Sequence, residues 1–181
     1  MNPLILLLTV LMSMEFNMKY NKIETINHIV SQNYPCCLKD FNQVILDEDN
    51  SLMTVPTLFS DVTVIDLDCI EIIKAKNEGR NRASTMDCCF AISDASNLEM
   101  LLVELRFNYQ NLSNLNRNKL VDKVNGSIAI LENTVKISNS YVFIFQSNLV
   151  QQAKSRLQRM MPQIPNNYVV MDLNDLITNY F

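Results

Sequence analysis

The sequence predicts an α/β fold built around a mixed β-sheet, and three observations lead to this prediction. Segments of strand-like composition alternate with segments of helical periodicity along most of the chain. The strand-like segments of the first half are joined by connections short enough for antiparallel pairing. Those of the second half are separated by helical segments, as parallel strands require. The expected order of elements is α-β-β-β-α-β-α-β.

Length and composition are those of one folded domain. The chain has 181 residues, of which 48% are hydrophobic and 19% are charged, enough to bury a sizeable core. We expect this α/β domain to cover residues 14–181. Residues 1–13 contain an apolar run that is too short to span a bilayer and has no preceding Lys or Arg. We expect them to be an untranslated or disordered arm, and we expect no membrane association.

The first half of the domain opens with a helix and continues with strands. Ile23, Ile26, Ile29 and Val30 recur at helical spacing, which predicts a helix of about three turns from Asn21 to Tyr34. A short apolar segment and an acidic turn at 47–50 follow. Three segments then have strand-like patterns and form an antiparallel meander. They are 61–76, read as one long or two short strands, then 88–92 and 100–108.

The second half alternates helices with strands. The spacing of Leu120, Val124, Ser127 and Leu131 predicts a helix over 119–131. The unbroken apolar run at 141–145 is typical of a strand that is buried on both faces. Three more elements complete the domain. They are a helix over 148–161 with Leu149, Ala153, Leu157 and Met160 on its buried side, a strand over 168–173, and a short helix from Asn174.

Rare residue types exclude several kinds of site. The chain has two glycines, and neither belongs to a glycine-rich phosphate-binding or dinucleotide-binding motif. Its one histidine, His28, is expected to be packed or exposed on a helix rather than to bind a metal. The five cysteines have no zinc-type spacing and give no disulfide framework. We expect them to be small buried hydrophobic residues in a reducing cytosol, so the predicted location is cytoplasmic.

Charge is distributed unevenly between the two halves. The net charge of the chain is −4. Residues 1–100 contain 7 Lys and Arg and 14 Asp and Glu, a balance of −7, whereas residues 101–181 contain 8 and 5, a balance of +3. The asymmetry is either random surface charge or a sign of function. In the second case the basic half contacts a phosphate backbone and the acidic half holds a metal or a partner.

Charged residues interrupt the apolar hairpin of 88–92 and 100–108. A turn centred between Ala95 and Ser96 places Asp87 opposite Glu104, on the same face of the sheet as Arg106. Directly paired residues have Cβ atoms about 5 Å apart, so these side chains are expected to meet at the open end of the hairpin. They form either a half-buried structural ion pair or the floor of a site.

The order of elements and these three residues resemble the PD-(D/E)XK nuclease superfamily, which includes restriction-type enzymes and Holliday-junction resolvases. Members have an α-β-β-β-α-β core with Asp on the second strand and Glu-x-Lys on the third. The matching residues are Asp87 and the run Glu104-Leu105-Arg106, in which Arg106 stands in place of the lysine. Because a guanidinium stays protonated, Arg106 is suited to hold a phosphate and not to act as a general base.

The resemblance implies a Mg²⁺-dependent phosphodiesterase. Asp87 and Glu104 are then the metal ligands, and all three residues belong to the catalytic site. The cations Arg117, Lys119 and Lys123 are read either as nucleic-acid contacts or as a solvated helix face. The alternative function is a non-catalytic protein-binding module of antitoxin or immunity type. In that case the acidic stretches 47–49 and 61–68 face a basic protein partner.

Overall fold

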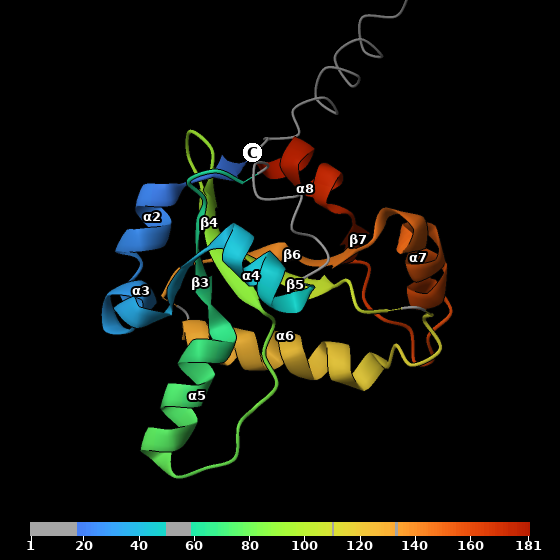
Figure 1. Ribbon diagram of the computed structural model, residues 1–181, viewed down its shortest axis with the longest axis horizontal. Coiled ribbons are helices and arrows are strands. Elements are labelled where there is room, and N and C mark those ends of the chain that lie inside the picture. The colour runs from blue at the N-terminus through green and yellow to red at the C-terminus, as the bar shows by residue number, and fades with distance from the viewer. Residues whose placement is uncertain (1–17, 50–58, 110, 133) are drawn as a thin grey trace, which may run out of the picture.

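The computed structural model describes residues 18–49, 59–109, 111–132 and 134–181, and the predicted arm at 1–13 lies outside these ranges. Within them a seven-stranded mixed sheet carries helices on its faces (Figure 1). The predicted α/β class with a mixed sheet is therefore confirmed. No helix in the described part of the chain is long and apolar enough to cross a bilayer.

The elements follow one another in this order. They are β1 (Lys19–Tyr20), α2 (Lys22–Asn27), α3 (Ile29–Asn33), the 3-10 turn η1 (Pro35–Cys37), β2 (Leu38–Asp40), α4 (Phe41–Glu48), β3 (Thr63–Asp66), α5 (Leu67–Glu78), β4 (Cys88–Ser93), β5 (Leu98–Arg106), α6 (Arg117–Leu131), β6 (Ile137–Phe145), the 3-10 turn η3 (Ser147–Leu149), α7 (Val150–Gln158), β7 (Tyr168–Met171) and α8 (Leu173–Tyr180).

The sheet combines an antiparallel and a parallel part. Its strand order is β2-β3-β4-β5-β6-β7, and β1 pairs with β4. Strands β2 to β5 pair in antiparallel fashion, whereas α6 and α7 are the crossovers that bring β6 and β7 parallel to their neighbours. The predicted antiparallel strands followed by parallel additions are thus present, but α5 lies between β3 and β4, where the predicted order had a direct connection.

The pairing of β4 with β5 has the predicted register. Cys88 lies opposite Val103 and Cys89 opposite Leu102. The turn that sets this register is closed by Asp94, whose Oδ1 accepts hydrogen bonds from the backbone N–H groups of Ser96 and Asn97, both at 2.8 Å. These bonds lower the pKa of Asp94, because they favour its ionised form.

Each face of the sheet has its own hydrophobic core. On one face, Leu102, Phe143 and Phe145 pack under α5, α6 and α7. On the other, Leu101, Val103 and Phe90 pack under α4 and α8. The predicted buried positions of α6 and α7 are confirmed, since Leu120, Val124, Ser127 and Leu131, and Leu149, Ala153, Leu157 and Met160, are all buried.

Three predictions in the first half are wrong. The expected turn at 47–50 begins inside α4, which continues to Glu48. Only 63–66 of the segment 61–76 is a strand, because the Asp66 carboxylate caps α5 at the Cys69 N–H and Gly79 ends that helix in the left-handed conformation. The predicted helix from Asn21 to Tyr34 is split at His28, whose ring accepts a hydrogen bond from the Val30 N–H. The split leaves Ile23 and Ile29 exposed instead of buried.

The prediction about the cysteines is only partly right. Cys88 and Cys89 are free and fully buried, as expected. Cys36 is exposed, and Cys37 and Cys69 form a disulfide, which the sequence reasoning did not foresee. The two are 32 residues apart, and their Cα atoms come within 5.5 Å because η1 lies against α5.

Candidate carboxylate–ammonium site

Asp87 is positioned by an extended segment that runs from α5 to β4 beside α6. In this segment the Met86 N–H donates to Ser127 Oγ of α6 at 2.8 Å. The Asp87 side chain then reaches across to β5, where its Oδ2 accepts the Leu105 N–H at 2.6 Å. Asp87 is therefore held between α6 and β5, and it is 8% exposed.

Glu104 lies near the end of β5 on the sheet face that α6 covers, and it is 1% exposed. Two cations contact its carboxylate. The Arg106 Nη2 is 2.8 Å from Oε1, and the Lys123 Nζ is 2.7 Å from the same oxygen and 2.9 Å from Oε2. Asp87, Glu104 and Arg106 are thus brought together as predicted, with Lys123 added from α6.

The Lys123 ammonium joins the two carboxylates. It is 3.4 Å from Asp87 Oδ1 in addition to its contacts with Glu104. Both acidic side chains therefore converge on one point, where the resemblance to the nucleases would place a metal ion. One ammonium and one guanidinium thus face two carboxyl groups, which offsets part of the cost of burying the group beneath α6.

Burial controls the protonation of these groups. It raises the pKa of Glu104 to about 8, with a further contribution from Asp87, and Arg106 and Lys123 offset only part of the increase. Burial also raises the pKa of Asp87. For Lys123, burial acts to lower the pKa, but the charges of Glu104 and Asp87 outweigh it and raise the value. Lys123 therefore stays protonated at neutral pH and is not available as a base.

We expect the pKa of Glu104 to make stability depend on pH. Between pH about 4.5 and 8 the folded chain keeps a proton on Glu104 that the unfolded chain releases, so stability falls as pH rises. The free energy of unfolding, measured in denaturant from pH 5 to 8, should decrease in the wild type relative to Glu104→Gln. The slope of this difference should approach about 1.4 kcal/mol per pH unit, and equal slopes for both chains would contradict it.

A pocket of about 410 Å³ opens beside Asp87. Its other acidic lining residues include Glu48 at the end of α4 and Asp68 in the first turn of α5. Burial and the charge of Asp87 raise the pKa of Glu48, which places these carboxyl groups in electrostatic contact. The pocket gives solvent a route to the Asp87 side of the cluster, whereas Glu104 stays buried behind it.

Of the three predicted nucleic-acid contacts, Lys123 belongs to the carboxylate cluster. Its side chain is 22% exposed. Arg117 and Lys119 lie at the start of α6, where Lys119 is exposed and Arg117 is partly buried. The helical spacing of α6 could have indicated that Lys123 faces the sheet, because Leu120 and Ser127, one turn before and after it, are buried. Glu48 and Asp68 are further neighbours of Asp87 that the sequence reasoning did not single out.

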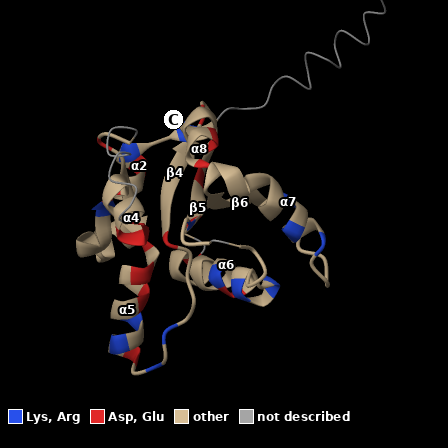
Figure 2. Ribbon diagram, turned by 45° about the vertical axis from the view of Figure 1, so that its right-hand side comes forward, with Lys and Arg blue, Asp and Glu red and all other residues tan. Residues whose placement is uncertain are grey.

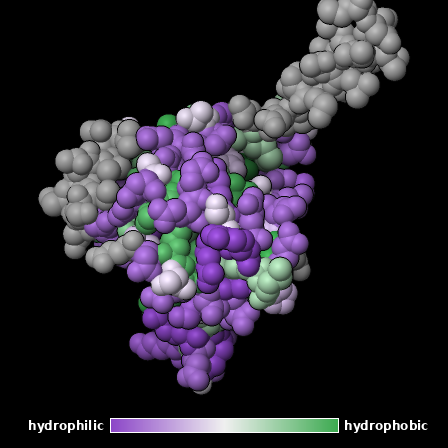
Figure 3. Space-filling view, turned by 90° about the vertical axis from the view of Figure 1, so that its right-hand side faces the viewer, coloured by the Kyte–Doolittle hydropathy of each residue, from purple (hydrophilic) through white to green (hydrophobic). Residues whose placement is uncertain are grey.

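The charged residues, which are distributed unevenly along the sequence, are also distributed unevenly in the fold. Asp and Glu lie at the end of α4 and along α5, which also carries Lys, whereas α6 and α7 carry several Lys and Arg (Figure 2). A second pocket of about 450 Å³ is lined by polar residues of α7 and of the loop before α6, including Arg156, Arg159 and Ser113. The surface that carries α7 is mostly hydrophilic (Figure 3).

Comparison of the chain with protein-family models, curated proteins and solved structures finds no match. The resemblance to the PD-(D/E)XK superfamily therefore stays a prediction. Function has to be inferred from the residues of the site.

Proposed function

We propose that the protein is a metal-dependent phosphodiesterase of the PD-(D/E)XK type in which α6 supplies the cation that the motif lysine provides in the family. The observation that carries this proposal is the contact of Lys123 Nζ with both Glu104 and Asp87, at 2.7 and 3.4 Å. The antiparallel strands β3 to β5, the crossover helix α6 and the parallel strand β6 follow the element order of the family, except that α5 is inserted between β3 and β4.

The residues fit a hard divalent cation in their chemistry. Carboxylate oxygens are the ligands that Mg²⁺ prefers, and those of Asp87 and Glu104 converge on a common point. Mg²⁺ held there would neutralise charge that develops on a scissile phosphate. Because Lys123 occupies that point, its ammonium has to move aside when a cation binds. The proposal therefore includes a rearrangement of Lys123 toward the phosphate.

The chain's own cations have separate roles in this proposal. Arg106 Nη1 donates to the Tyr109 hydroxyl at 3.2 Å while Nη2 contacts Glu104, so its guanidinium is oriented from two sides for a phosphate oxygen. Lys123, protonated because its pKa is raised, gives a proton to the oxygen that leaves phosphorus as water attacks. Arg117, Arg156 and Arg159 then contact the phosphates of the nucleic acid on either side of the bond that is cleaved.

The experiment is cleavage of labelled single-stranded and double-stranded DNA and RNA with Mg²⁺ or Mn²⁺. We expect wild-type cleavage to be lost on addition of a chelator and to fall about a hundredfold or more in Glu104→Gln and Asp87→Asn. Glu99→Gln is the matched control. Glu99 also lies on β5 and pairs with a lysine, Lys136, but it does not belong to the cluster. Its activity should equal that of the wild type.

A second candidate function is the non-catalytic binding module. It is favoured by the closure of the site, in which Glu104 is 1% exposed under Lys123, and by the acidic residues at the end of α4 and the start of α5, Asp47, Glu48 and Asp68. It requires a stable complex with a basic protein that Glu104→Gln leaves intact. The absence of metal-dependent cleavage on all four substrates, together with such a complex, would favour this module over the phosphodiesterase.

A further inference from the structure

Three cysteines gather on the side of the fold where η1 meets the first turn of α5. The sulfur atoms of Cys36, Cys37 and Cys69 all lie within 4.8 Å of one another. Cys37 and Cys69 are bonded as a disulfide, and Cys36 is a free, exposed thiol beside it. This group is distinct from the carboxylate–ammonium cluster and does not depend on the proposed function.

We propose that these three cysteines, once the disulfide is reduced, form a binding site for a thiophilic cation such as Zn²⁺. Tetrahedral coordination with bonds of about 2.3 Å separates the sulfurs by about 3.8 Å. The three sulfurs already lie within 4.8 Å of one another, so movements of about an ångström suffice. Breaking the S–S bond, which is needed to free two of the ligands, also moves Cys37 and Cys69 toward that spacing.

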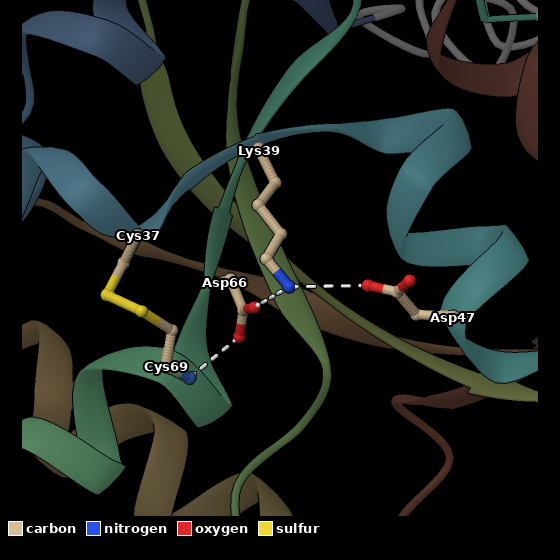
Figure 4. The surroundings of a disulfide bond; sticks show 5 residues. All are labelled: Cys37, Lys39, Asp47, Asp66 and Cys69. Carbon is tan, nitrogen blue, oxygen red and sulfur yellow. Dashed lines mark hydrogen bonds and ion pairs between the residues drawn. A yellow bond between two sulfur atoms is a disulfide. The ribbon is translucent and has the colours of Figure 1, made fainter.

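The surroundings hold the two chain segments in place without the disulfide. Asp66 accepts the Cys69 N–H at 2.8 Å through Oδ1 and pairs with Lys39 of β2 at 2.8 Å through Oδ2 (Figure 4). The ladder between β2 and β3 joins the same segments through the pairing of Leu38 with Ile65. Reduction should therefore leave η1 and α5 together, with the sulfurs still grouped.

The position of Cys69 favours a thiolate once the disulfide is reduced. Cys69 lies in the first turn of α5, where the backbone N–H groups and the helix dipole stabilise a negative sulfur. Cys36 is exposed, which gives the cation a route of entry. The reaction consumes one dithiol reductant, which becomes a disulfide, and three thiol protons are released as the cation binds.

The test is titration of the chain with Cd²⁺. Binding is monitored by the thiolate-to-Cd²⁺ charge-transfer absorption and by native mass spectrometry. We expect the chain reduced with a dithiol to bind one Cd²⁺, to release it when Zn²⁺ is added in excess, and to be protected at Cys36 from alkylation. The oxidised chain should bind at least tenfold more weakly, because two of its sulfurs are bonded to each other.

Cys36→Ala is the decisive variant, since Cys36 is exposed and its loss leaves the core intact. We expect this substitution to weaken Cd²⁺ binding at least tenfold. The charge-transfer absorption should fall from the value for three bound thiolates to the value for two. Cys89→Ala is the matched control, because Cys89 is a free, buried thiol that is not one of the three grouped cysteines, and it should bind as the wild type does. Equal binding by Cys36→Ala, equal binding by the oxidised chain, or no binding by the reduced wild type would overturn the proposal.

Discussion

Replacing Lys123 with methionine should destabilise the fold by about 3 kcal/mol at pH 8 to 9, because it leaves two buried carboxylates with Arg106 as their cation. Methionine preserves the length and the apolar stem of the side chain, so the loss reports the charge. At pH 5 Glu104 holds a proton, since its pKa is raised to about 8, and the same substitution should then cost much less. Denaturant unfolding at both pH values measures the difference.

Lys119→Met is the control for this substitution. Lys119 lies one turn earlier on α6 and is exposed, so its loss should change stability by less than about 0.5 kcal/mol at either pH. A double-mutant cycle between Lys123→Met and Glu104→Gln isolates the interaction energy of this pair. The coupling energy should be positive, and larger at pH 8 to 9 than at pH 5. A cost for Lys123→Met that does not change with pH would mean that the ammonium contributes through packing alone.

Sequence reasoning succeeded where short-range patterns determine the structure. The alternation of β4 and β5 together with the Asp94 turn fixes their register, and that register brings Asp87 to Glu104. It failed at 61–76, where many β-branched residues favoured strands. Asp66 and Gly79, which begin and end α5, were the better guides there. Capping residues outweigh intrinsic β-preference when the helix has a sheet face to cover.

The remaining features of the site depend on contacts between distant segments. Lys123 reaches Glu104 because α6 crosses the sheet face between β5 and β6. From its charge alone, Lys123 was expected on a solvated helix surface or at a nucleic-acid contact. The Cys37–Cys69 disulfide depends in the same way on η1 meeting α5. Pairings of this kind have no local signature, because they are set by which helix covers which face of the sheet.

Gly126→Ala is expected to destabilise the chain by about 3 kcal/mol or more, although helix propensity alone predicts a gain of about 1 kcal/mol at this interior position of α6. A Cβ at Gly126 would lie 2.1 Å from the backbone oxygen of Ser84. Backbone cannot rotate away as a side chain can, so the segment before β4 has to leave α6. That movement breaks the bond from Met86 N–H to Ser127 and displaces Asp87 from Lys123.

Gly79→Ala separates this steric effect from the general cost of losing a glycine. Gly79 has a φ of 62°, but a Cβ added there would meet no atom within 4 Å, so alanine should cost only about 1 kcal/mol of backbone strain. Hydrogen exchange gives a second measurement, since the Met86 amide should lose protection in Gly126→Ala and keep it in Gly79→Ala. A stabilised Gly126→Ala chain would show that the segment holding Asp87 moves freely from α6, and the carboxylate–ammonium site would then lack the rigid support that its chemistry needs.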